Sequence, residues 1–117
     1  MLPLEGITVV TLEHAIAAPF CTRQLADLGA RVIKVERPGV GDFARAYDGR
    51  VRGLASHFVW TNRSKESLTL DVKHPQAAVI LDGLAKGLVS HYEATEMIAC
   101  SGLPIASSMV AHRIDIA

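Results

Sequence analysis

The chain has 117 residues, of which 50% are hydrophobic and 21% are charged. This composition is typical of a folded globular protein with at most one small domain, and it argues against disorder. Twelve Lys and Arg residues balance twelve Asp and Glu residues, so the chain lacks the net positive charge expected of a nucleic-acid-binding protein. No apolar run approaches the roughly 20 residues that span a bilayer, which argues against a membrane protein.

The two cysteines, Cys21 and Cys100, are far apart and too few for a disulfide framework. The first residues, MLPLEGITVV, have no basic region, and Glu5 stands where a secretory signal would be apolar. These features predict a soluble protein of the reducing cytoplasm, in which Cys21 is a small buried hydrophobic residue. The histidines are too dispersed to predict a metal site.

The first predicted elements form a βαβ unit. Residues 7–12 (ITVVTL) are almost continuously apolar and β-branched, which predicts a strand buried on both faces. Pro19 suits the start of a helix, and Gly29 suits a left-handed cap at its end. Residues 30–36 (ARVIKVE) form a second β-branched run. A strand, a helix and a strand within about 30 residues predict a parallel pair with a right-handed crossover.

The next segment is predicted to be a loop that could face a ligand. Residues 37–52 contain Pro38 and several glycines and show no sustained period. The loop would follow the carboxyl end of the second strand, where ligands of open α/β sheets tend to bind. Basic residues outnumber acidic ones between positions 31 and 65. This local excess suits a small phosphorylated ligand.

The remaining predicted elements are a short helix, a strand and an amphipathic helix. Residues 54–61 (LASHFVWT) suit a short helix, and residues 67–72 (SLTLDV) alternate as a strand does. A further helix begins near His74 and Pro75, with apolar residues at three-and-four spacing as far as Leu88. We therefore predict an α/β, Rossmann-like partial parallel sheet with flanking helices over residues 1–88, and a divergent tail over residues 89–117.

Two segments carry a family resemblance. The opening LPLEGITVVTLEHAIAAPFCTRQLADLGARVIKVERPGVGDFAR resembles the start of class III CoA-transferases, the group of the formyl-CoA and carnitine CoA-transferases. The later segment TNRSKESLTLDVKHPQA is similar to a second signature of that family. The resemblance implies a truncated N-terminal part of the large domain of such an enzyme, which transfers CoA between an acyl-CoA and a carboxylic acid.

The resemblance also implies which residues contact CoA. In this family the turn after the first strand, an arginine after the second strand, a basic residue of the Asn signature and the end of the third strand all approach CoA. The matching positions are His14, Ala15, Ile16, Ala17, Arg37, Lys65, Leu70 and Lys73. Arginine and lysine suit the phosphates of CoA, and small side chains let the backbone approach the ligand. Without the resemblance, His14 would be interpreted as a packed residue and both lysines as surface charges.

The departures from the family pattern limit the predicted activity. Glu66 replaces a second basic residue, and nothing after Lys86 aligns with the family. The family's nucleophilic aspartate, which forms a mixed anhydride and releases CoA, lies downstream of the matched part. We therefore expect no catalytic residue here and an N-terminal fragment that is inactive alone. None of the following aspartates occupies the nucleophile's place: Asp27, Asp42, Asp48, Asp71, Asp82 and Asp115.

Partners and alternatives follow from the same features. The resemblance implies an acyl-CoA as substrate, no permanently bound cofactor and a homo-oligomer, because the family forms interlocked dimers. One alternative is a non-catalytic fragment that self-associates without CoA binding. Another is nicotinamide binding through Glu36, which the absence of glycine in the turn EHAIAAPF disfavours. Trp60 and Phe58 suit a core or an interface better than a base-stacking platform.

Overall fold

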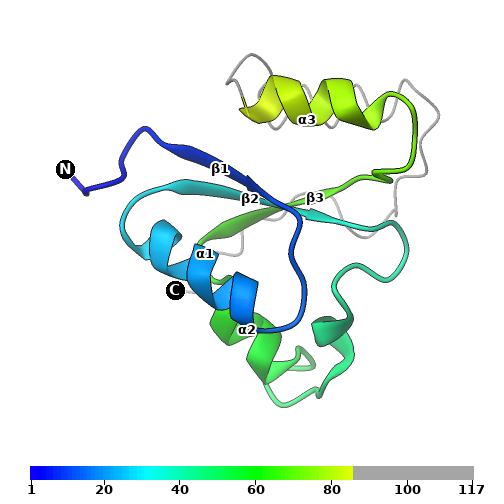
Figure 1. The fold of residues 1–117 in the computed structure, drawn as a ribbon. Helices are drawn as coiled ribbons and strands as arrows, with labels where there is room; N and C mark the ends of the chain where they lie inside the picture. Colours follow the sequence, from blue (N-terminus) through cyan, green and yellow to red (C-terminus); the bar gives the residue numbers. More distant parts are fainter. Residues whose placement is uncertain (86–117) are drawn as a thin grey trace.

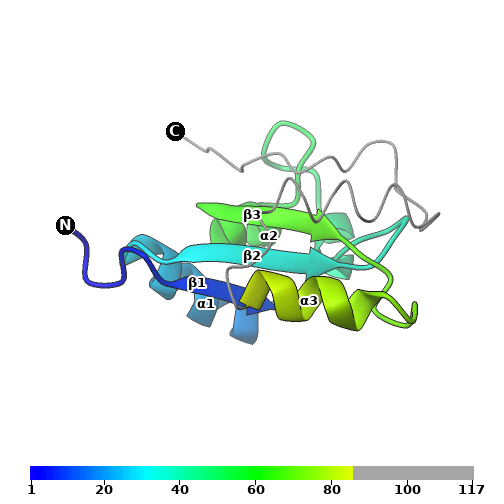
Figure 2. The ribbon, with the colours of Figure 1, turned by 90° about the horizontal axis from the view of Figure 1, so that it is seen from above.

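The computed structural model describes residues 1–85, so the predicted tail 89–117 lies outside the described residues. Three parallel strands form a sheet in the order β1-β2-β3. Helices α1 and α2 lie on one face of this sheet and α3 lies on the other, as Figures 1 and 2 show. The elements are β1 (Thr8–Thr11), α1 (Ala17–Asp27), β2 (Arg31–Glu36), the 3-10 helix η1 (Phe43–Ala46), α2 (Ser56–Asn62), β3 (Lys65–Thr69) and α3 (Ala77–Ala85).

The predicted α/β fold with a parallel sheet and flanking helices is confirmed. Strand β3 begins and ends earlier than the predicted 67–72. Its start was missed because its first two residues are charged and the pattern gave no sign of a strand there. The loop predicted over 37–52 includes η1, whose start is capped by the side chain of Asp42. Gly29 adopts a φ of +102° directly after α1, as a left-handed cap requires.

The face of the sheet beneath α3 is apolar. Side chains alternate along a strand, so Ile33 and Val35 of β2 point to the same side. They form a buried cluster with residues of β3, of the segment that follows it and of α3. The other members are Leu68, Leu70, Ala77, Ile80 and Leu84. This apolar layer is the main hydrophobic core of the described residues.

The face of the sheet that carries α1 and α2 is polar. The alternate residues of β2, Lys34 and Glu36, are buried, as are Lys65, Ser67 and Thr69 of β3. The charged groups of Lys34, Glu36 and Lys65 bind groups of the loops and helices, as the hydrogen bonds described below show. A smaller apolar cluster of Ala44, Ala55 and Phe58 lies among η1, α2 and the segment between them.

Two burial predictions were wrong. Strand β1 is only partly buried, because it is the outermost strand of the described sheet and one of its edges is unpaired there. Cys21 is exposed, since it lies on the face of α1 that points away from the sheet. Within residues 1–85, no helix is both long enough and apolar enough to cross a bilayer.

Candidate functional site

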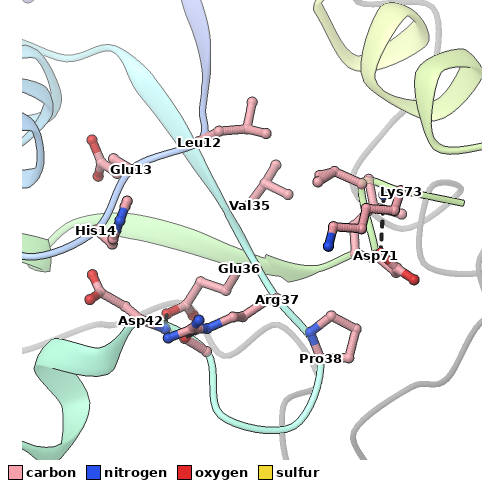
Figure 3. Close-up of a pocket in the computed structure, with 13 residues that line it drawn as sticks. Leu12, Glu13, His14, Val35, Glu36, Arg37, Pro38, Asp42, Asp71 and Lys73 are labelled. Atoms are coloured by element: carbon pink, nitrogen blue, oxygen red, sulfur yellow. Dashed lines mark hydrogen bonds between the residues drawn. The ribbon is translucent and has the colours of Figure 1, made fainter.

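A pocket opens at the edge of the sheet where the three strands end. Its volume is about 670 Å³, within the usual range for small-molecule sites. Figure 3 shows residues of the β1 end on one side, those of the β2 end in the middle, and those that follow β3 on the other side. The lining residues are Leu12, Glu13, His14, Val35, Glu36, Arg37, Pro38, Gly41, Asp42, Leu70, Asp71, Val72 and Lys73.

The position of this pocket follows from strand direction. Because all three strands are parallel, their carboxyl ends lie at one edge, and the segments that follow them meet there. The backbone N–H of Leu70 donates to the carbonyl of Glu36 at 2.9 Å, so the pairing of β2 with β3 extends to the pocket rim. The sequence-based expectation of a ligand-facing loop after the second strand therefore matches the location of the pocket.

The turn after β1 has an unusual backbone conformation. Ala15 has a φ of 67°, in the left-handed region that side chains with a Cβ rarely adopt. Its N–H donates to Oδ1 of Asp42 at 3.1 Å. The preceding residue, His14, is exposed and lines the pocket, and its ring meets the ring of Phe43 edge-on with centroids 5.1 Å apart.

Two buried lysines lie beneath the pocket. Nζ of Lys65 is 2.7 Å from Oε1 of Glu13, and Nζ of Lys34 is 2.5 Å from Oδ2 of Asp42. Oδ1 of Asn62 accepts from both ammonium groups, at 2.9 Å from Lys34 and 3.2 Å from Lys65. Burial lowers the pKa of Lys65, while its pairing with Glu13 opposes that shift. The two ion pairs and their shared amide form one buried layer, which we call the lysine layer.

The third buried carboxylate, Glu36, is paired as well. It accepts hydrogen bonds from Arg45, at 2.6 and 3.0 Å, from the hydroxyl of Ser67 and from the N–H of Asp42. Burial alone would raise the pKa of Glu36, but these donors outweigh it and hold the pKa below its usual value. Glu36 is thus occupied by internal donors, and this occupation disfavours the ribose-binding role considered for it.

Asp42 is held in a similar way. Burial would raise the pKa of its carboxyl group, but Lys34 and the N–H groups of Ala44 and Ala15 outweigh burial and keep the pKa low. Three of the acidic residues that line the pocket, Glu13, Glu36 and Asp42, therefore have a cation bound to them from within the protein. Their charges are largely neutralised before any ligand arrives.

Two cations remain at the pocket surface. Arg37 and Lys73 are exposed, and both line the pocket. Nε of Arg37 donates to the carbonyl of Gly41 at 2.9 Å, which places the guanidinium at the rim. In Figure 3 the amino group of Lys73 points across the pocket toward β2. The backbone N–H of Lys73 donates to the side chain of Asp71, so the segment after β3 forms a local turn.

The sequence-predicted site residues fall into three groups. His14, Arg37, Leu70 and Lys73 come together around the pocket. Ala15, Ile16 and Ala17 lie in the turn and at the start of α1, beside the pocket but not among its lining residues. Lys65 is 1% exposed and paired with Glu13, so its ammonium serves an internal contact. Whether any of these residues contacts CoA stays a prediction.

Sequence reasoning missed the acidic half of the pocket. Glu13 and Asp42 were not singled out, although Glu13 directly precedes His14 and Asp42 closes the glycine-rich stretch after β2. Their position at the ends of strands was the available signal. Lys65 lies 52 positions from Glu13, and Lys34, eight positions from Asp42, lies inside a β-branched run where a lysine gives no sign of being buried. Among residues 1–85, no group of three or more His, Cys, Asp or Glu side chains is placed to hold a metal ion.

The arrangement suits binding of an anion, and its three cation-paired carboxylates, Glu13, Glu36 and Asp42, are poorly suited to act as nucleophiles. A buried carboxylate that is hydrogen-bonded and paired with a cation is a poor nucleophile, because attack would break those contacts. Exposed Arg and Lys beside an apolar wall of Leu12 and Val35 suit a ligand with a phosphate group and a less polar arm.

Comparison with known proteins identifies the relatives of this chain. Residues 4–88 match the profile of CoA-transferase family III. Succinyl-CoA:glutarate CoA-transferase from Mus musculus is 43% identical over 86 residues, which cover 73% of this chain and 20% of that protein. Formyl-CoA:oxalate CoA-transferase from Bradyrhizobium sp. (strain ORS 278) is 43% identical over 84 residues, which cover 71% of this chain and 20% of that protein.

Solved structures give the same result. A CAIB/BAIF family protein from Brucella suis superposes with a TM-score of 0.63 at 35% identity, over 71% of this chain and 23% of that chain. A hypothetical protein from Mycobacterium tuberculosis has a TM-score of 0.61 at 40% identity, over 68% of this chain and 21% of that chain. The chain thus spans about a fifth of the length of the curated relatives that it matches. On the match of residues 4–88, the chain belongs to CoA-transferase family III.

Proposed function

We propose that the pocket at the strand ends binds the phosphorylated part of a CoA thioester. The described residues would then form one wall of the acyl-CoA site of a CoA-transferase, which moves CoA between an acyl-CoA and a carboxylic acid. The substrate class is supported by family membership, since the relatives named above are CoA-transferases. The location is supported by the pocket itself, which four of the predicted contact residues line.

The observation that carries this proposal is the distribution of charge in the pocket. Glu13, Glu36 and Asp42 each bind an internal cation, whereas Arg37 and Lys73 present theirs at the surface. A phosphate approaching the pocket therefore meets exposed cations, and three of the four carboxylates in the lining are already screened by paired cations. The fourth, Asp71, accepts a hydrogen bond from the backbone N–H of Lys73. Arginine can bind a phosphate through two parallel hydrogen bonds, and lysine can act as a point charge.

Calorimetric titration of the full chain with acetyl-CoA tests the proposal. We expect saturable heat, and we expect Arg37→Ala and Lys73→Ala each to weaken binding by about tenfold, the loss of one charge-assisted contact. Arg50→Ala is the matched control, because Arg50 is exposed and lies outside the pocket lining. Pantetheine, which lacks the phosphates, should bind far more weakly than CoA.

Two results would contradict this site. One is the absence of heat from a wild-type sample that circular dichroism shows to be folded. The other is an equal loss of affinity in Arg50→Ala and in the two pocket variants, which would indicate a diffuse charge effect rather than a site.

A second proposal is self-association, with or without CoA. Phe20 and Trp60 stack with their ring centroids 5.3 Å apart, and they are 40% and 49% exposed. Exposed aromatic pairs are typical of protein interfaces. Sedimentation velocity should show a concentration-dependent dimer that Trp60→Ser weakens. A monomer at all concentrations would contradict this proposal and leave the CoA site unaffected.

A further inference from the structure

One buried side chain joins the loop after β1 to the loop after β2. Oδ1 of Asp42 accepts from the N–H of Ala15 at 3.1 Å and from the N–H of Ala44 at 2.9 Å. Its other oxygen, Oδ2, is 2.5 Å from Nζ of Lys34. The Asp42 side chain is 0% exposed. The turn after β1 is therefore fastened to the η1 loop and, through Lys34, to the middle strand of the sheet.

The next residue in the chain, Phe43, makes a second connection between the two loops. Its ring meets the His14 imidazole at an interplanar angle of 87°, the edge-to-face arrangement that aromatic rings prefer. Phe43 is 40% exposed, so its ring belongs to the surface and not to the core. His14 lines the pocket, and Phe43, which is not among the lining residues, contacts its imidazole from outside.

The conformation of the turn shows why such support is needed. A left-handed backbone costs a residue with a Cβ about 1–2 kcal/mol relative to the right-handed alternatives. A strained conformation of this kind persists when its surroundings hold it in place. For Ala15, the hydrogen bond from its N–H to the buried Asp42 supplies that restraint.

We propose that Asp42 and Phe43 are positioning residues for ligand binding. Asp42 holds the Ala15 backbone, Phe43 holds the His14 ring, and together they keep the turn after β1 in the shape that lines the pocket. Neither residue needs to touch the ligand. A turn ordered in advance loses less conformational entropy on binding, so its loosening weakens affinity. The ligand in this proposal is the CoA thioester of the proposed function, on which it rests.

The decisive variant is Phe43→Ala, because an exposed ring can be removed with little effect on folding. We expect it to weaken acetyl-CoA binding by about three- to tenfold, the range for an aromatic contact of this kind, with the melting temperature close to that of the wild type. Tyr47→Ala is the matched control. Tyr47 is a similarly exposed aromatic at the end of η1 that contacts Phe43 and His57.

A measurement without ligand separates this proposal from the one it rests on. In NMR relaxation measurements on the free full chain, Phe43→Ala should make the His14 ring more mobile, and Tyr47→Ala should leave its mobility unchanged. Asp42→Asn, where it folds, should speed exchange of the Ala15 amide proton relative to the amides of β2. A shift of the His14 signals alone does not count, because loss of the neighbouring Phe43 ring current shifts them in any case.

Each outcome has a defined meaning. Unchanged His14 mobility in Phe43→Ala, or an affinity loss as large in Tyr47→Ala, would overturn the positioning role. A more mobile His14 ring with unchanged affinity would overturn it too, because the turn would then not matter to the ligand. If the wild type binds no acetyl-CoA, the proposed function fails. The free-protein measurements then decide alone whether Asp42 and Phe43 hold the turn.

Discussion

The two faces of the sheet are built from the same strands but by different chemistry. Toward α3, Ile33 and Val35 join an apolar layer that is non-directional and depends on packing. Toward α1 and α2, Lys34 and Lys65 join the lysine layer, in which each group needs particular partners at particular distances. One strand thus serves both layers through the alternation of its side chains.

The two layers contribute differently to stability and to geometry. Burial of apolar area stabilises the fold, but it constrains the loops at the strand ends only weakly. A buried ion pair adds little net stability over an apolar replacement, since desolvation offsets its attraction. It does impose geometry, because Glu13 and Asp42 lie in the loops beside the pocket and their partners lie on strands. We infer that the apolar face mainly sets stability, although its Val35 and Leu70 also line the pocket, and that the polar face holds the loops beside the pocket.

The largest expected effect comes from breaking one pair of the lysine layer. Glu13→Ala leaves the Lys65 ammonium buried without its carboxylate, which should cost about 3–5 kcal/mol of unfolding free energy and disturb the turn beside it. Urea unfolding followed by circular dichroism measures the loss. A cost below about 1 kcal/mol would mean that water reaches Lys65 and that the layer is not dry.

A cavity in the apolar face should lower the unfolding free energy nearly as much but leave ligand affinity almost unchanged. Ile80 is 1% exposed within the cluster beneath α3, and Ile80→Ala should lower the unfolding free energy by about 2–5 kcal/mol. The acetyl-CoA affinity of the molecules that remain folded should stay within about twofold of the wild type. A larger loss of affinity, after correction for the folded fraction, would show that the two faces are not separable in this way.

A fall in pH should lower the stability of the fold by protonating carboxylates of the polar face and its loops. The pKa values of Glu36 and Asp42 lie below their usual values, and hydrogen bonds from Ser56 and Arg50 lower the pKa of Asp48 from 3.8 to about 2. The folded protein therefore binds fewer protons than the unfolded chain in this range. Stability should be at its full value above about pH 5 and should fall as the pH drops toward 2.

A pH series of urea unfolding curves checks this expectation. Asp48→Asn should show a shallower decline between about pH 4 and pH 2, whereas Ile80→Val should shift the whole curve down without changing its slope. Stability that does not change over this range would contradict the lowered pKa values.

The smallest effect is expected from an ion pair at the surface. Arg63 and Asp27 are joined at 2.7 Å, but their side chains are 44% and 30% exposed. Arg63→Gln should change the unfolding free energy by about 0–1 kcal/mol, and moderate salt should erase most of that difference. The loss of one charged partner would then cost much more in a buried pair than in an exposed one. An effect as large as that of Glu13→Ala would mean that buried and exposed ion pairs contribute equally to stability.

Much of the fold could be predicted from local patterns. The β-branched run 30–36, Gly29 and the apolar spacing of α3 are short-range signals, and the elements form where these signals lie. The edge of the sheet at which the pocket lies could also be predicted, from the direction of the parallel strands. The start of β3 was missed because Lys65 and Glu66 are charged, and a charged pair normally indicates a solvated segment.

The interior of the site could not be predicted, because some of its partners are distant in the sequence and no local pattern marks the near pairs, such as Lys34 with Asp42. Lys65 meets Glu13 across 52 positions, and Lys34 meets Asn62 across 28. No periodicity in the sequence predicts that a lysine will be buried. A buried lysine needs a carboxylate partner, and the fold brings that partner to it. Cys21 was wrongly expected to be buried because the prediction followed its residue type and not its position on the helix.

The left-handed backbone at Ala15 sets up a conflict between two kinds of selection. In a library randomised at this position, glycine and asparagine would relieve the strain, so heat challenge alone should enrich them. Glycine would also give the segment more conformational freedom in both the unfolded and the native state. Screening for tight ligand capture should therefore disfavour glycine, and sequencing both survivor pools would reveal a trade-off between ruggedness and recognition at a single codon.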